Sequence, residues 1–400
     1  MNLRYVYFGL ILLGVSLVFM FLFFEANKAE LDLPSWKSYA LDMQAPSRFL
    51  DLIYDSKNNP HIFYYAERTG GGVKHAYSEN TVKDFYKMGR NWKEEQINKE
   101  LTLGFFISAD IDYKDTVHLS FMNYQIGRDR LFYYNTSAKE QVLIDSIRVS
   151  GIGTGVYSVV VFVDGKGPYV FYHVDQGRKF MMARPGEEPV LLETETGVNT
   201  AGVAYGSKIF LAHRGRDDLK LRLSSYDTKT GEWKTEFRDI TANAMGVGIF
   251  KERPYVVFYN YDDKGIYFSF FEDEVPKKIA DGYESRISTD ASEEGIYVSF
   301  NRRKEGLFVL KSDDANAFEE VLFVEGANAG IFSSIKVTEN NDIKVAYLDG
   351  ETLKYDEFER SSYLYHSNLR ETKKMIFMGL FIIFISLCVM CFGISFFKES

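Results

Sequence analysis

The sequence predicts an all-β protein: a seven-bladed β-propeller closed by an N-terminal strand and flanked by N- and C-terminal transmembrane helices. Three observations lead to this prediction. An aromatic strand pattern recurs seven times, one strand-like segment is left over near the N-terminus, and a long apolar run lies at each end of the chain. About 350 residues separate the two runs without a Pro/Gly/Ser linker, and a repeat architecture accounts for such a length.

The two apolar runs span Tyr5 to Phe24 and Met375 to Phe397. Each reaches the length of about 20 residues that a helix needs to cross a bilayer core. In the first run, large Phe residues occupy the place where small residues would mark a cleavage site, so we favour a signal anchor over a cleavable signal peptide. The expected organisation is a transmembrane helix over 1–25, a linker over 26–35, a propeller of about seven blades over 36–362, a polar linker over 363–374 and a transmembrane helix over 375–397.

The repeated unit is a short run of aromatic and aliphatic residues. Its first copy is Pro60 to Tyr65 and its last is Asp342 to Leu348. The copies centre on Tyr64, Phe121, Tyr172, Ala212, Tyr259, Phe300 and Tyr347, at spacings of about 40 to 57 residues. Similar runs precede and follow each copy, separated by Gly, Asn, Asp and Pro. This pattern is typical of antiparallel strands, four to a blade.

The last copy lacks an outer strand, because the chain passes from Phe358 towards the second apolar run. Trp36 to Leu41 has the same pattern as the outer strands Trp92 to Ile97 and Trp233 to Phe237. We therefore predict that Trp36 to Leu41 pairs with residues near 353–358 and completes the seventh blade. Such a closure removes the open sheet edges.

Small residues recur at seven-residue spacing in both apolar runs. They are Gly9 and Ser16 in the first run, and Gly379, Ser386 and Gly393 in the second. Small residues allow two helix backbones to approach closely, so we expect these positions to pack the helices together. The alternative is that Gly and Ser are simply common in membrane spans. Both cysteines, Cys388 and Cys391, lie in the second run, so the propeller contains no disulfide.

The charge pattern bears on orientation and partners. Arg4 favours an N-terminus inside the cell, whereas Arg370, Lys373 and Lys374 favour the opposite orientation. Because the first helix usually dominates, we expect a two-pass protein of the cell (inner) membrane with its propeller on the extracytoplasmic (periplasmic) side. The net charge of −9 disfavours nucleic acid as a partner. The expected partners are the lipid bilayer and other integral membrane proteins.

Two segments of the first blade, Asn59 to Tyr65 and Val73 to Tyr77, resemble bacterial sialidase-like propeller repeats of the BNR type. The resemblance implies a propeller fold and not a reaction, because the fold hosts many functions. The Ser-x-Asp-x-Gly-x-x-Trp turn that marks many sialidase-like blades is not found in this sequence.

Candidate site residues follow the repeated strand directly. Propeller ligands commonly lie at the mouth of the central channel, where equivalent positions from several blades converge. Four successive blades offer a hydrogen-bonding group at this level, two of them followed by an arginine: His173, His213, Asn260, Asn301, Arg214 and Arg302. These residues suit an anionic or glycan-like ligand. The alternative is that they cap turns or face solvent.

The sequence contains no catalytic signature, and we expect neither a metal nor a cofactor. Two histidines without a convergent carboxylate make a poor metal site. We therefore expect a non-catalytic scaffold or protein-interaction subunit of a membrane complex. One alternative is a ligand- or glycan-binding sensor. A second is a sialidase-like glycoside hydrolase, which would need an arginine cluster, a nucleophile and a general acid from different blades.

Overall fold

The structure is a computed structural model of the chain. It describes residues 3–28, 36–42, 49–66, 71–84, 87–98, 103–123, 129–147, 154–282, 286–358 and 360–397. The chain forms two compact units, one of residues 38–357 and one that joins residues 1–37 to residues 358–400. Each unit is described by itself.

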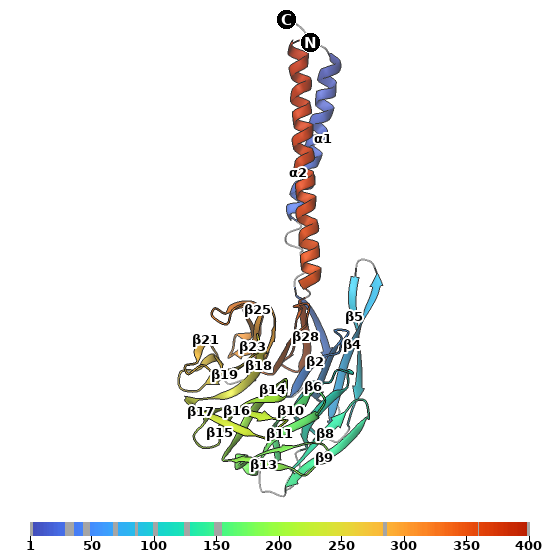
Figure 1. Cartoon of the computed structure of the whole chain (residues 1–400). Coiled ribbons are helices and arrows are strands. Elements are labelled where there is room, and N and C mark those ends of the chain that lie inside the picture. Colours follow the sequence, from blue (N-terminus) through green and yellow to red (C-terminus); the bar gives the residue numbers. More distant parts are fainter. Residues whose placement is uncertain are drawn as a thin grey trace. The chain divides into compact units, whose positions relative to one another are not determined.

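The larger unit is a seven-bladed β-propeller, as predicted, and every blade is a four-stranded sheet (Figure 1). Sequential strands are neighbours in six blades, and the seventh combines the last three strands with β1. The strands of the first four blades, A to D, are β2 Leu50–Tyr54, β3 Pro60–Tyr65, β4 Val73–Asp84 and β5 Lys87–Gln96; β6 Leu103–Ile111, β7 Val117–Asn123, β8 Asp129–Asn135 and β9 Glu140–Ile147; β10 Thr154–Val163, β11 Gly167–Val174, β12 Lys179–Ala183 and β13 Val190–Thr194; and β14 Thr196–Tyr205, β15 Lys208–Gly215, β16 Lys220–Asp227 and β17 Trp233–Thr241.

The last three blades, E to G, complete the ring. Their strands are β18 Asn243–Phe250, β19 Arg253–Asn260, β20 Gly265–Phe270 and β21 Lys277–Asp281; β22 Ser288–Ser292, β23 Gly295–Arg302, β24 Gly306–Ser312 and β25 Glu319–Glu325; and β26 Ser333–Val337, β27 Ile343–Asp349, β28 Thr352–Phe358 and β1 Lys37–Asp42. Each innermost strand contacts those of both neighbouring blades, and β26 contacts β2. The sheet edges therefore meet in a closed ring.

The predicted closure is confirmed, because β1 is the outermost strand of blade G and pairs with β28. Buried polar contacts hold it there. The Tyr39 hydroxyl donates to Glu357 at 3.2 Å, and Arg90 of blade A forms a 2.7 Å ion pair with the same carboxylate. Both partners of the ion pair are almost fully buried. The first blade and both strands of the closure are thereby tied together.

The repeated run is the second strand of each blade, and burial explains its composition. All residues of β7 are buried, and so is the aromatic half of β11. A strand covered on both faces needs a continuous apolar run and not an alternating one. In every blade this strand packs its aromatic and aliphatic side chains against the neighbouring blades.

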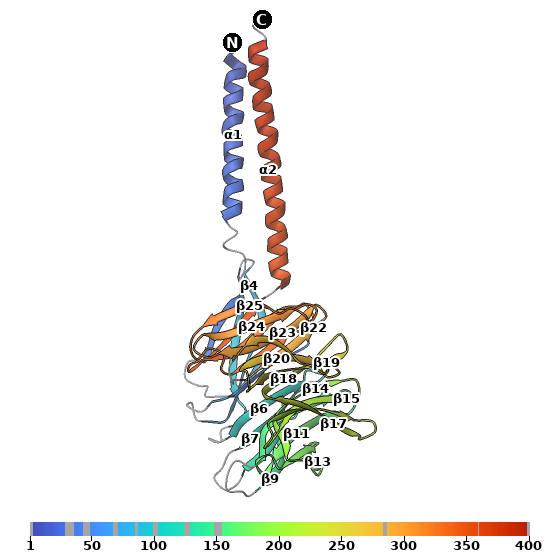
Figure 2. The same cartoon turned by 90° about the vertical axis from the view of Figure 1, so that its left-hand side faces the viewer.

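The smaller unit contains two helices, α1 (Leu3–Lys28) and α2 (Arg360–Phe397). Figures 1 and 2 show them side by side and antiparallel. Thr372–Cys391 of α2 is apolar and long enough to cross a membrane, whereas the described apolar stretch of α1, Tyr7–Leu22, is shorter. The linker predicted over 363–374 is instead the first part of α2. Residues 360–374 contain neither Gly nor Pro, so nothing in them interrupts a helix.

The helix contact includes some of the predicted small residues. Gly9 and Ser16 are buried in it, and the Cys388 thiol lies 3.2 Å from the Gly9 carbonyl oxygen. Gly379 is partly buried. Ser386 is exposed, and its hydroxyl donates to the Ile382 carbonyl, so this residue does not pack between the helices. The surroundings of Gly393 lie outside the described residues.

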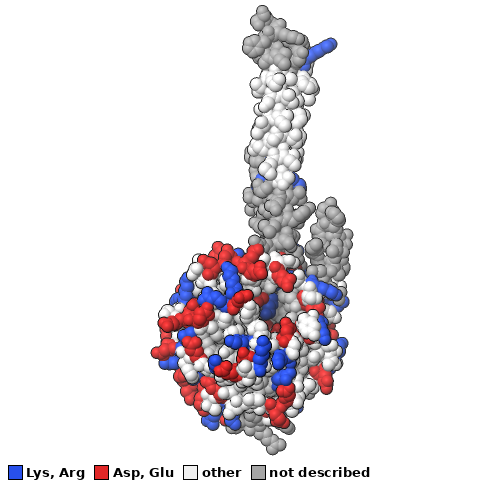
Figure 3. All heavy atoms as spheres, viewed as in Figure 1, with Lys and Arg blue, Asp and Glu red and all other residues white. Residues whose placement is uncertain are grey.

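Charged residues are distributed very differently over the two units. Acidic and basic side chains are interspersed over the visible face of the propeller, whereas the described surface of the helix pair between its ends is uncharged (Figure 3). An uncharged apolar surface is what a bilayer core requires.

Candidate functional site

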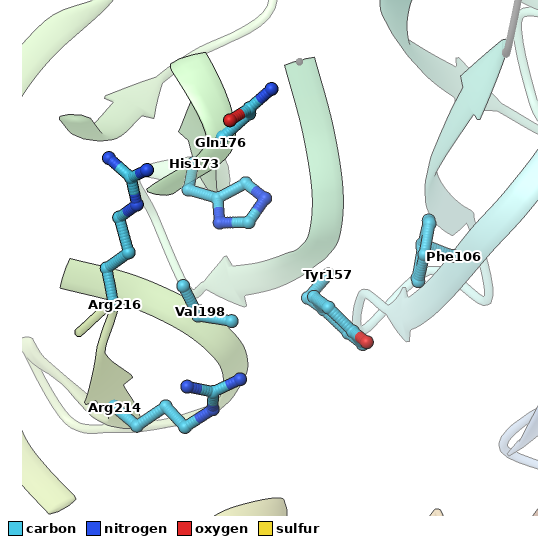
Figure 4. Close-up of a pocket in the computed structure, with 7 residues that line it drawn as sticks. All are labelled: Phe106, Tyr157, His173, Gln176, Val198, Arg214 and Arg216. Carbon is cyan, nitrogen blue, oxygen red and sulfur yellow. The ribbon is translucent and has the colours of Figure 1, made fainter. Parts of the chain in front are cut away.

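A cavity of 330 Å³ opens at one end of blades B, C and D. In each blade the innermost strand begins, and the second strand ends, at this end of the ring, because these two strands are antiparallel. In blade C, for example, Thr154 at the start of β10 pairs with Val174 at the end of β11. Figure 4 shows the residues that surround the cavity. They come from β6, β10, β11, the turn after β11, β14 and the end of β15: Phe106, Tyr157, His173, Gln176, Val198, Arg214 and Arg216.

His173 provides a polar group without a protein partner. The residue is 5% exposed, and its Nδ1 atom is buried and makes no hydrogen bond. Burial, together with the nearby Arg214 charge, lowers the pKa of His173 to about 4. The imidazole is therefore neutral at pH 7. Because a buried nitrogen without a partner is costly, this atom is suited to a ligand that supplies the missing hydrogen bond.

Two arginines give the cavity its charge. Arg214 follows His213 in β15 and donates from Nη1 to the Gly215 carbonyl oxygen at 3.2 Å. Arg216 is partly buried and lies 3.6 Å from both Glu195 and Asp217. None of the seven lining residues is acidic. The lining therefore favours a ligand that carries negative charge.

Two aromatic side chains reach the cavity through irregular backbone. Phe106 and Tyr157 each have a φ of 54°. Phe106 lies at a bulge where β6 shifts register against β7, and Tyr157 lies at a bulge where β10 shifts register against β11. A bulky residue rarely adopts such a φ, which costs of order 1–3 kcal/mol. The two rings lie 4.6 Å apart, and Tyr157 is 39% exposed. Because such outliers cluster at functional sites, the accessible ring of Tyr157 is a candidate ligand contact.

Neither aromatic residue was among the predicted site residues. A signal for one of them is present in the sequence, since Thr154-Gly155-Val156-Tyr157-Ser158 recurs one blade later as Thr196-Gly197-Val198-Asn199-Thr200. Asn199 also has a positive φ, of 55°. The recurring Thr-Gly-Val motif thus marks the bulge at which a blade turns one side chain out of the regular strand alternation.

Of the six predicted residues, the structure brings only His173 and Arg214 into the cavity. His213 is fully buried inside blade D. Its Nδ1 lies 2.8 Å from the Thr196 hydroxyl and its Nε2 lies 2.8 Å from the Ser224 hydroxyl. Burial lowers the pKa of His213 to about 3. Both ring nitrogens already have partners, so this residue holds the blade together and does not face a ligand.

The other three predicted residues also serve local structure. Asn260 accepts hydrogen bonds from the Thr241 hydroxyl and from the Asp262 backbone N–H. Asn301 donates to the carbonyl oxygens of Gly306 and Ala329. Arg302 lies over the Phe308 ring and forms a 3.2 Å ion pair with Glu305. The structure therefore does not bring these three side chains into the cavity, and each has partners nearby.

No group of three or more His, Cys, Asp or Glu side chains within the described residues is arranged to hold a metal ion. The cavity itself contributes one imidazole and two guanidinium groups, and a guanidinium does not coordinate metals. Hydrogen bonding, charge pairing and ring contact are therefore the interactions that this lining offers.

Comparison with known proteins identifies the fold and no family. No protein-family model and no curated protein matches the sequence. Among solved structures, the BP39L lectin from Burkholderia pseudomallei has a TM-score of 0.53 at 11% identity, covering 80% of this chain and 97% of that one. A PL25 ulvan lyase bound to -[GlcA(1-4)Rha3S]- has a TM-score of 0.52 at 13% identity, covering 80% and 95%. The resemblance to propeller proteins is confirmed at the level of fold, and no family model supports sialidase-type repeats.

Proposed function

We propose that this protein is a membrane-anchored, non-catalytic receptor that binds a saccharide ligand in the cavity at the end of blades B, C and D. One observation carries the proposal: the ring of Tyr157, held at a positive φ, lines the same cavity as Arg214 and His173, whose Nδ1 is buried without a hydrogen-bond partner. An exposed ring beside directed polar groups suits a ligand that has both an apolar face and hydroxyl or acidic groups.

Two further points support a saccharide. The propellers of similar fold include a protein named a lectin and a polysaccharide lyase bound to an acidic disaccharide unit. The lining residues that the structure describes include no carboxylate pair of the kind that glycoside hydrolases use, which supports binding over hydrolysis.

The test is a binding measurement with matched variants of the full-length protein in mild detergent. Neutral and acidic oligosaccharides are immobilised, and the bound protein is quantified. Tyr157→Ala and Arg214→Ala are expected to lower affinity at least tenfold, because each removes a group that lines the cavity. Arg302→Ala is the control, because Arg302 holds the equivalent position two blades away but lies outside the cavity. Equal effects of Arg214→Ala and Arg302→Ala contradict the proposal, and so does release of cleaved sugar.

A second candidate function is that of a scaffold subunit in a membrane complex. The observation that favours it is the apolar outer surface of the helix pair, where side chains such as Phe8, Ile11, Ile382 and Val389 are exposed. Two helices hold a domain at a membrane more rigidly than one, and their outer faces suit other membrane helices as well as lipid. Stoichiometric co-purification of other membrane proteins in mild detergent supports this function. A lone monodisperse protein contradicts it.

We also propose two membrane passes, with the propeller on the extracytoplasmic side. The basic start at Arg4 supports this orientation. The propeller contains no cysteine, so a single Lys229→Cys change in an exposed turn introduces one accessible thiol. In intact cells this thiol is expected to react with a membrane-impermeant maleimide. Labelling only after lysis indicates the opposite orientation.

A further inference from the structure

The start of the innermost strand carries an aromatic residue in four successive blades. Their equivalence follows from the pairing of the innermost strand with the second strand. Each aromatic residue stands two positions before an innermost-strand residue that pairs with the same position of the second strand in every blade. These pairs are Ser334 with Ala346, Asp51 with Phe63, Ser108 with Ser120, and Val159 with Phe171. The four residues are Phe332 of blade G, Phe49 of blade A, Phe106 of blade B and Tyr157 of blade C, and together they are called the aromatic arc.

The rings of the aromatic arc form a continuous series. Ring centroids are 5.7 Å apart between Phe332 and Phe49, 4.5 Å between Phe49 and Phe106, and 4.6 Å between Phe106 and Tyr157. The three phenylalanines are partly buried and Tyr157 is exposed. Each ring therefore contacts the next, and the series ends at the cavity, whose lining includes both Phe106 and Tyr157.

The rest of the ring has a different character at this level. Blades D and E have Asn199 and Ala244 at their bulges, and blade F has Arg286. Arg286 donates to the Leu50 carbonyl oxygen at 2.6 Å and lies 3.8 Å from Asp51, so it serves the ring itself. At the compared positions of the innermost strands, aromatic residues thus occur in blades G, A, B and C, and the basic residues Arg214 and Arg216 line the cavity at the blade C end of this series.

The volume of the cavity limits what it holds. At 330 Å³ it is at the low end of the range of about 300–1,000 Å³ for small-molecule sites. A ligand that fills the cavity and also contacts Phe49, two blades from His173, is therefore elongated. A chain of pyranose rings has this shape, and the apolar C–H face of each ring suits an aromatic side chain. An acidic group on one sugar matches the arginines.

We propose that the ligand is a linear acidic oligosaccharide whose charged sugar occupies the cavity beside Arg214, while its following sugars lie along the aromatic arc. This inference rests on the proposed saccharide-binding function. It adds a ligand class and a direction, from blade C across blades B and A towards blade G.

The experiment measures affinity against chain length. Full-length protein in detergent is titrated with oligoglucuronides of one, two, four and six units and with their carboxyl-reduced counterparts. Affinity is expected to rise at least tenfold from one to four units and to fall at least tenfold on carboxyl reduction. Phe49→Ala is expected to lower the affinity for four and six units at least tenfold more than the affinity for the single unit. Phe323→Ala is the matched control, because this exposed ring lies on the outer strand β25 of blade F.

Each outcome decides one of the two ideas. Binding that is independent of chain length and of Phe49 overturns the arc, which is then a hydrophobic plug, but leaves the receptor function standing. Equal binding of acidic and carboxyl-reduced chains overturns the acidic ligand class alone. Absence of binding at every length, with either chemistry, overturns the receptor function itself. If Phe49→Ala unfolds the protein, Phe49→Leu replaces it, because leucine keeps apolar bulk and removes the ring.

Discussion

His173 and His213 occupy equivalent positions in neighbouring blades, but they have different roles. Both are buried, and burial lowers the pKa of each below that of a free histidine. Around His213, blade D supplies a hydroxyl to each ring nitrogen, from Thr196 and Ser224. Around His173, blade C leaves Nδ1 without a partner and a cavity beside the ring. The neighbours of a polar side chain thus decide whether it holds the fold together or faces a ligand.

The largest expected effect comes from removing the ring in blade D. His213→Ala eliminates two buried hydrogen bonds and leaves space beside Phe180, so the propeller is expected to lose about 3 kcal/mol of unfolding free energy. His173→Ala eliminates no hydrogen bond at Nδ1, so its loss is expected to be smaller than that of His213→Ala. Chemical unfolding followed by circular dichroism measures both. Equal losses would mean that the two histidines do not differ in role.

Acid is expected to act on both histidines and so to sharpen their comparison. Each has a folded pKa below the unfolded value near 6.5, so the unfolded chain binds more protons and stability falls as the pH drops below 6.5. The loss continues to about pH 4 for His173 and about pH 3 for His213. At pH 5 it amounts to about 2 kcal/mol for His213.

Variants isolate these contributions from those of other buried histidines such as His75, whose pKa burial lowers to about 4. Unfolding is measured between pH 7.5 and 5 for the natural protein, His173→Gln and His213→Gln. Each variant is expected to show a shallower pH dependence. A bound acidic ligand stabilises protonated His173. It should therefore reduce the contribution of His173 to the pH dependence of the unfolding free energy and leave the contribution of His213 unchanged. A ligand that changes the contribution of His213 would contradict the assignment of His173 to the cavity and of His213 to the blade interior.

The repeat was visible in the sequence because burial on both faces of the second strand imposes a run of aromatic and aliphatic residues in every blade. The closing strand was visible for a related reason, since Trp36 to Leu41 follows the half-polar pattern of an outer strand such as Trp92 to Ile97. These features depend on local pattern and on the need to cover sheet edges. Such features can be predicted from one sequence.

The site was only partly predictable. Six candidate residues were chosen because they directly follow the repeated strand, and two of them, His173 and Arg214, line the cavity. Position in a blade fixes the end of the ring on which a residue lies. It did not separate them from His213 and Arg302, because partners from other strands decide that. Phe106 and Tyr157 were missed, since strand alternation gives no indication of a bulge that turns a side chain to the other face.

The smallest expected change in unfolding free energy concerns Asn260 in blade E and Asn301 in blade F. These asparagines hold the positions that His173 and His213 hold in blades C and D. The Asn301 amide donates to two buried carbonyl oxygens, at 3.2 Å for Gly306 and 2.7 Å for Ala329. Asn301→Ala is therefore expected to cost about 1 kcal/mol of unfolding free energy. Asn301→Asp should cost more, because a carboxylate only accepts hydrogen bonds and would face both carbonyl oxygens.

Asn260 provides the matched comparison, because it acts through its oxygen, which accepts from the Thr241 hydroxyl and from the Asp262 N–H. Asn260→Asp keeps an acceptor in place, and its cost should be smaller than that of Asn301→Asp. Neither substitution is expected to change saccharide affinity, since neither side chain lines the cavity. Thermal unfolding and the binding assay, run on the same four variants with Asn260→Ala included, check both statements. If a variant at either position loses affinity without losing stability, that asparagine is a ligand-binding residue.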